Sequence, residues 1–172
     1  LAQRSTFVEV AYLLIYGKFP KKAELTNFRT NLRKYSLIHE DMKVFFNAYP
    51  RGAHPMGILS SMVCSLSAFN PELLVPNINT TEQDRDLIIT HLMSKIRVLA
   101  AFAYKRSVGE KFIYPRNDYD FIENFLHMMF TTPIYDYEVL PEVKKAVELL
   151  LILHADHEQN CSAATVRMVG SS

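Results

Sequence analysis

The hydrophobic positions along the chain repeat with the spacing of α-helices. Near the N-terminus, Ser5 or Thr6 can cap a helix, and Glu9 completes a capping box with Thr6. Gly17 can end this helix in a left-handed conformation. Its predicted buried face consists of four apolar residues at helical spacing: Phe7, Val10, Ala11 and Leu14.

Similar patterns continue through the chain. We expect a second helix to open at Pro20, and we expect a turn at residues 51–57. Thr80, with Gln83, can cap a longer helix whose predicted buried side is Leu87, Ile88, Leu92, Ile96 and Leu99. Asn117 or Asp118 can cap the helix after it. No stretch alternates apolar and polar residues cleanly enough to be a strand. The sequence therefore predicts an all-α, multihelical fold with no significant sheet, with residues 70–79 as an internal connection in one domain.

A dense polar cluster follows the last clear helix, which we expect to open at Pro141. The aliphatic run Leu149–Leu153 leads directly into residues 154–160, which read HADHEQN. Polar groups at the end of a buried segment cost free energy unless they have partners. If the helix continues, His154 and His157 share a face, and Asn160 extends it. Such donors suit a small anionic or carbonyl ligand.

Two other interpretations of the cluster stay open. One is a metal site. A zinc protease helix needs the order H-E-x-x-H, whereas this sequence has H-x-x-H-E, and no closed set of metal ligands lies nearby in the sequence. The cluster can also be structural, since a histidine at a helix end often caps it.

Elsewhere, His54 is expected to make local hydrogen bonds, and Arg116 is a loop candidate for an anion contact. The remaining histidines are predicted to lie at the core edge or surface without polar partners: His39, His91 and His127.

Composition narrows the classes of function. The 172 residues are 49% hydrophobic, which is typical of a folded domain with a core. The net charge of +1 and the lack of a basic run argue against nucleic acid. Cys64 and Cys161 form no disulfide framework and weakly indicate a reducing compartment. Uninterrupted apolar runs are far shorter than the ~20 residues of a membrane span, and no signal peptide is visible. Because the chain starts at Leu1, we expect its true N-terminus to be missing.

Five stretches together resemble the citrate synthase family, most closely its common bacterial form. They are STFVEVAYLLIYGKFP, HPMGILSSM, YPRND, ENFLHMMFTTP and LHADHEQNCSAATVRMVGSS, and they occur in the family's order. The resemblance implies an all-α enzyme that condenses acetyl-CoA with oxaloacetate to give citrate and CoA. It implies acetyl-CoA as cosubstrate, no permanently bound cofactor or metal, no membrane partner, and a homodimer or a hexamer of dimers. The implied location is cytoplasmic in a bacterium, or the mitochondrial or peroxisomal matrix in a eukaryote.

The resemblance also implies roles for the polar cluster. His157 matches the histidine that binds oxaloacetate, and Asn160 matches an asparagine that lines the substrate site. Ser162 is expected to support a neighbouring catalytic histidine, and His154 is expected to support the site. The family's catalytic acids and bases follow this motif, so none is expected in this chain and all are expected downstream of Ser172.

The chain is therefore expected to be part of the large helical domain, residues 1–172, without the small CoA-binding domain or the C-terminal part. On its own it is expected to be inactive. Two alternatives remain open. One is a 2-methylcitrate synthase that uses propionyl-CoA with nearly the same motif. The other is a non-catalytic helical interaction module that keeps the helices and has lost the ligand.

Overall fold

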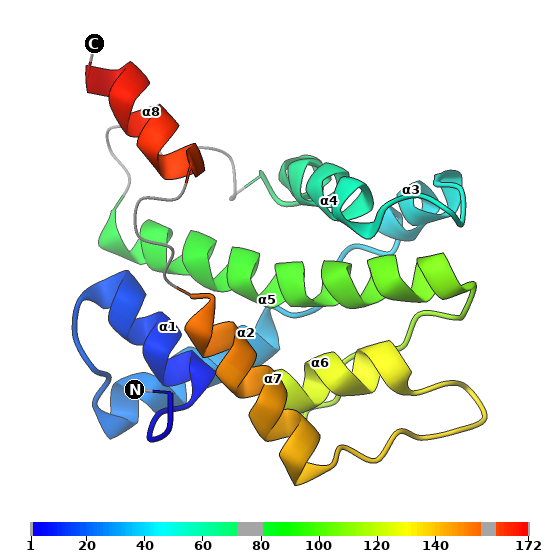
Figure 1. Ribbon diagram of the computed structural model, residues 1–172, viewed down its shortest axis with the longest axis horizontal. Helices are drawn as coiled ribbons and strands as arrows, with labels where there is room; N and C mark the ends of the chain where they lie inside the picture. The colour runs from blue at the N-terminus through cyan, green and yellow to red at the C-terminus, as the bar shows by residue number, and fades with distance from the viewer. Residues whose placement is uncertain (1, 72–80, 156–160, 172) are drawn as a thin grey trace.

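The computed structural model describes residues 2–71, 81–155 and 161–171, and these ranges form eight α-helices (Figure 1). In chain order the helices are α1 (Phe7–Tyr16), α2 (Lys22–Lys34), α3 (Met42–Ala48), α4 (Pro55–Phe69), α5 (Glu82–Val108), α6 (Phe121–Phe130), α7 (Pro141–Leu153) and α8 (Cys161–Ser171). The described ranges hold no strand, only one isolated bridge between Thr132 and Tyr135. The predicted all-α fold is confirmed.

The long helix α5 is the centre of the fold. In Figure 1, α3 and α4 lie on one side of α5, and α1, α2, α6 and α7 lie on the other. Val98, Leu99 and Phe102 of α5 are fully buried. They belong to the main core, whose other buried members are Ile38, Met42, Phe46, Ile58, Met62, Leu66, Ala101, Ala103 and Met128. A smaller core joins α1 to α2 through Val8, Tyr12, Phe28 and Leu32.

Long cationic side chains of α5 are buried among backbone carbonyl groups. Lys95 Nζ donates to the carbonyl of Leu37 at 2.6 Å, just beyond the end of α2. Lys105, with no exposed surface, donates to the carbonyl of Thr131 at 2.7 Å, directly after α6. Buried charges are tolerated when they have such partners. These bonds fix the ends of α2 and α6 against α5.

Because α5 has neighbours on several sides, its burial does not follow a single stripe. Ile96, predicted to be buried, is 43% exposed. The helix also begins differently from the prediction, since Thr81 caps it and forms a capping box with Asp84. By length and composition alone, α5 could cross a membrane, but 56% of its most apolar window is buried inside the protein. An apolar composition and a window buried inside the protein are typical of a central core helix.

The predicted limits of the first helix are confirmed. Thr6 and Glu9 form the capping box of α1, and Gly17 ends it with a φ of 70°. The cap of α6 is wrong in detail. Asp120, rather than Asn117 or Asp118, accepts hydrogen bonds from the first turn of that helix.

Two other helices begin away from their predicted positions. α2 begins at Lys22, because Lys21 and not Pro20 precedes the first helical turn. α4 begins at Pro55, inside the segment predicted to be a turn, and His54 is its N-cap. The His54 Nδ1 atom accepts a hydrogen bond from the Met56 N–H at 3.2 Å, so the predicted local hydrogen bonding of His54 is confirmed.

Candidate functional site

The polar motif starts where α7 ends. The last helical residue is Leu153, and His154 is the C-cap, with its N–H donating to the carbonyl of Leu150 at 3.1 Å. Ala155 lies in a bend. The helix ends before His154, so the condition for a helical face shared with His157 is not met at His154, and His154 instead occupies the helix end, as the structural interpretation expects. His157 and Asn160, the predicted oxaloacetate ligands, lie outside the described residues.

The His154 side chain is exposed and folds back on the helix. Its Nδ1 atom lies 2.7 Å from the carbonyl oxygen of Leu150. A carbonyl oxygen can only accept, so Nδ1 carries the hydrogen in this bond. The neutral imidazole then presents Nε2 as an acceptor. This arrangement fixes the ring at the helix end.

Ser162 lies on the other side of the motif, as the second residue of α8, and it is exposed. The hydrophobic side chains of α8 are also exposed: Val166 at 74%, Met168 at 72% and Val169 at 71%. In Figure 1, α8 stands away from the helices that surround α5. The described residues therefore bring neither His154 nor Ser162 into a closed cavity.

The aliphatic run before the motif is only partly buried. Ile152 is buried, whereas Leu150 is 56% exposed and Leu153 is 66% exposed. The segment before the motif, which the sequence indicated as buried, is therefore exposed at two of its leucines. Two leucines at the helix end therefore present an apolar surface beside the motif.

Ion pairs hold α7 in place on its other side. Lys144 Nζ lies 2.5 Å from an oxygen of Asp120, the N-cap of α6, and 2.8 Å from Glu123 in the first turn of that helix. Burial lowers the pKa of Lys144, but the hydrogen bonds that Lys144 donates to these carboxylates outweigh it and raise the pKa overall. Glu148 Oε1 accepts a hydrogen bond from the Phe7 N–H at 3.1 Å. Lys144 and Glu148 therefore anchor the helix that leads into the motif.

A second polar group forms around His127, which is only 5% exposed. His127 Nδ1 lies 2.9 Å from Thr131 Oγ1 and 3.7 Å from Asp136. Burial lowers the pKa of His127 more than Asp136 raises it, so the ring is neutral at neutral pH. The contact with Asp136 is therefore not an ion pair. The predicted lack of polar partners is wrong for His127, and i+4 spacing to Thr131 was the available signal.

The other sequence candidates have mainly structural surroundings. Arg116 donates two hydrogen bonds to Asp118, at 3.0 and 2.8 Å, so its guanidinium fork is occupied from within the chain. His91 is buried, with its ring 3.9 Å from that of Tyr35. Within residues 2–71, 81–155 and 161–171, no three His, Cys, Asp or Glu side chains form a group that could hold a metal ion.

Comparisons with known proteins place the chain in a family. The family described as citrate synthase, C-terminal domain, matches residues 1–172. "Citrate synthase 1" of Mycobacterium tuberculosis is 48% identical over 172 residues, which are 100% of this chain and 39% of that protein. The chain thus spans about two fifths of the length of the curated relatives it matches.

Solved structures show the same fold. A citrate synthase from Pyrobaculum aerophilum superposes with a TM-score of 0.79 at 33% identity, covering 92% of this chain and 39% of that one. A citrate synthase from Thermotoga maritima superposes with a TM-score of 0.73 at 26% identity, covering 94% of this chain and 39% of that one. The helical arrangement described above is thus shared with these enzymes.

Proposed function

Because the chain belongs to the citrate synthase family, we propose that the complete gene product condenses acetyl-CoA and oxaloacetate with water, giving citrate and CoA. This reaction is the entry to the tricarboxylic acid cycle. The observation that carries the proposal is the family match over all 172 residues, with 48% identity to a named citrate synthase across the whole chain.

The proposed contribution of this chain is half of the oxaloacetate site. His157 and Asn160 act as substrate-binding donors, and His154 and Ser162 support them. Oxaloacetate carries two carboxylates and an electrophilic carbonyl, so fixed imidazole and amide N–H groups both bind it and polarise the carbonyl. The bond from His154 to Leu150 and the ion pairs of Lys144 hold the helix that leads into this motif.

The bond-forming steps belong to residues outside this chain. In the proposed mechanism, an aspartate removes a proton from the acetyl-CoA methyl group, one histidine stabilises the enol, and another protonates the oxaloacetate oxygen. We therefore assign no catalytic residue here, and we propose that residues 1–172 form part of the large domain. Acetyl-CoA is a cosubstrate, no permanent cofactor is needed, and the complete protein is a homodimer or a hexamer of dimers.

A thiol-release assay with acetyl-CoA and oxaloacetate tests the activity. The complete gene product should release CoA thiol only when both substrates are present. The isolated 172-residue chain, assayed in parallel, should show no turnover above background. Lack of turnover by the complete protein, together with no oxaloacetate binding by calorimetry, would instead indicate a non-catalytic helical module.

The acyl substrate is tested by comparing kcat/KM for acetyl-CoA and propionyl-CoA on the complete protein. We expect acetyl-CoA to be preferred. Preference for propionyl-CoA would identify a 2-methylcitrate synthase, which uses nearly the same motif. The family match holds for either outcome, so this measurement alone decides between them.

A further inference from the structure

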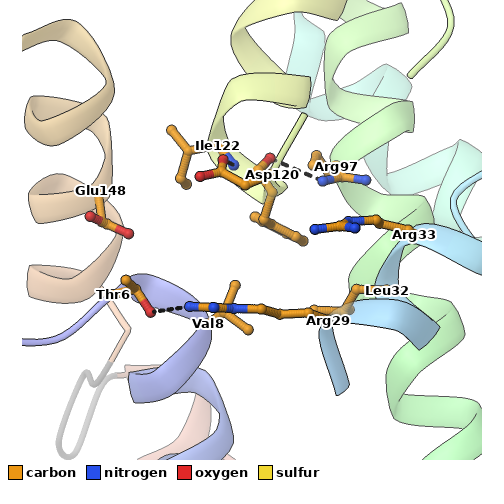
Figure 2. Close-up of a pocket in the computed structure, with 10 residues that line it drawn as sticks. Thr6, Val8, Arg29, Leu32, Arg33, Arg97, Asp120, Ile122 and Glu148 are labelled. Atoms are coloured by element: carbon orange, nitrogen blue, oxygen red, sulfur yellow. Dashed lines mark hydrogen bonds between the residues drawn. The ribbon is translucent and has the colours of Figure 1, made fainter. Parts of the chain in front are cut away.

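A cavity of about 140 Å³ lies between α1, α2, α5, α6 and α7 (Figure 2). One water molecule needs roughly 10–15 Å³ of cavity volume, so this cavity can hold a ligand larger than water. Three arginines line it, namely Arg29 and Arg33 from α2 and Arg97 from α5. Figure 2 shows Arg33 and Arg97 on the side opposite Glu148, while the Arg29 side chain reaches across toward Thr6. The lining therefore carries three positive charges.

The two acidic residues in the lining are already engaged. Asp120 accepts hydrogen bonds from the first turn of α6 and pairs with Lys144 at 2.5 Å. Glu148 accepts a hydrogen bond from the Phe7 N–H and lies 3.7 Å from Lys145. Within the described residues, neither carboxylate forms an ion pair with a cavity arginine. The charge of the arginines is therefore poorly compensated.

Arg97 is the most buried of the three, with 5% of its surface exposed. Its Nη1 donates to the carbonyl of Phe121 at 3.0 Å, and its guanidinium carbon lies 4.3 Å from the centroid of the Phe121 ring. Its Nε and Nη2 atoms are buried without a hydrogen-bond partner. Burial lowers the pKa of Arg97 to about 10, although Asp120 opposes this change. The group stays charged at neutral pH, and an unpaired buried charge is costly.

The other two arginines provide donors that can reach a guest. Arg29 Nη2 makes one long contact, 3.4 Å, with Thr6 Oγ1. The Arg33 side chain is exposed, and its guanidinium has no ion pair with a described residue. Guanidinium groups bind carboxylate and phosphate through paired, charge-assisted hydrogen bonds. A small anion in this cavity would meet three cations and offset the charge of Arg97.

We propose that this cavity binds a small oxyanion carrying two negative charges, of the phosphate or dicarboxylate class, held by Arg29, Arg33 and Arg97. The site goes beyond the proposed synthase reaction, because it is built from α2 and α5 rather than from the motif after α7. Binding of the anion stabilises the junction of α2, α5 and α6, since only the folded chain brings these arginines together.

The test is thermal unfolding of the complete gene product with inorganic phosphate or malonate, at constant ionic strength set with chloride. At least one of the two anions should raise Tm saturably. A phosphate response identifies a phosphoryl ligand, and a malonate response identifies a dicarboxylate. A Tm that rises no further with either anion than with chloride would overturn the proposal.

Arg97→Met separates anion binding from a structural role. Methionine keeps much of the volume and removes the buried charge, so without the anion the variant should be at least as stable as the wild type. With saturating anion, only the wild type should gain stability. A response of equal size in Arg97→Met would overturn the proposal, and so would a variant destabilised equally with and without the anion.

Arg33→Gln tests the site without disturbing the core, because Arg33 is exposed. It should raise the anion Kd about tenfold, the loss expected for one charge-assisted hydrogen bond. Arg85→Gln is the matched control, since Arg85 is an exposed arginine of α5 outside the cavity lining and the change in net charge is the same. Equal Kd values for Arg33→Gln and Arg85→Gln would contradict the assignment.

Discussion

Lys144 of α7 and Asp120 at the start of α6 lie 2.5 Å apart, Nζ to carboxylate oxygen. The same Nζ atom lies 2.8 Å from Glu123. Asp120 also accepts from the first N–H groups of α6. One lysine therefore joins the helix that leads into the substrate motif to the capped end of its neighbour.

Replacing Lys144 with methionine should destabilise the complete protein by about 1–2 kcal/mol, because two partly buried carboxylates lose their cation. Urea unfolding measures the change. Lys145→Met is the control on the same helix. Lys145 is more exposed and, among the described residues, pairs only with Glu148, at 3.7 Å, so its loss should stay within about 0.5 kcal/mol. Equal losses for the two variants would show that Lys144 is an ordinary surface lysine.

Gly17→Ala should destabilise the protein by about 1 kcal/mol, because Gly17 has a φ of 70° and an L side chain is strained there. Gly52→Ala is a matched control. An added Cβ meets nothing within 4 Å at either position, and only Gly17 has the left-handed backbone. Thermal unfolding of both variants should show a lower Tm for Gly17→Ala alone.

The parts of the fold that depend on neighbours in sequence could be predicted. Thr6, Glu9 and Gly17 act within a few residues of one another, so their pattern was sufficient to give both ends of α1. The environment of α5 depends on elements far away in the chain. Ile96 follows the apolar spacing but is exposed, while Lys105 interrupts that spacing and is fully buried. No local pattern encodes the distant carbonyl of Thr131 that makes this possible.

In the candidate site, too, the local features could be predicted and the contacts between distant elements could not. The composition of the motif after α7 was sufficient to single it out, but the sequence left open whether the helix continues through His154, and the backbone leaves the helix there. The cavity arginines gave no signal in the sequence. Arg29 and Arg33 are four residues apart on one helix, whereas Arg97 comes from a helix whose contact with α2 only the folded chain creates.

His127 makes stability depend on pH. Burial lowers its pKa below the ordinary value of 6.5. As pH falls through about 6.5, the unfolded chain binds a proton at this imidazole and the folded protein does not. The free energy of unfolding should therefore decrease from pH 6.5 downward, until the folded-state pKa is reached. Urea unfolding at pH 7.5 and pH 5.5 measures this decrease.

His127→Gln removes the titrating group and retains a polar side chain that can face Thr131. The variant is expected to be less stable at pH 7.5, because the buried contact with Thr131 changes. Its stability should fall less than that of the wild type between pH 7.5 and pH 5.5. A decrease of the same size in both proteins would assign the pH dependence to other groups.

His157→Ala should impair the complete enzyme in two ways. If His157 donates a hydrogen bond to oxaloacetate in both the ground state and the transition state, its loss raises the oxaloacetate KM and lowers kcat, reducing kcat/KM by roughly 100-fold. His39→Ala is the control, because His39 is an exposed histidine whose Nδ1 accepts a local hydrogen bond from the Asp41 N–H. Steady-state kinetics with varied oxaloacetate at saturating acetyl-CoA should give KM and kcat values for His39→Ala that are close to those of the wild type. Unchanged kinetics for His157→Ala would remove this residue from the substrate site and leave Asn160 as the one predicted ligand in this chain.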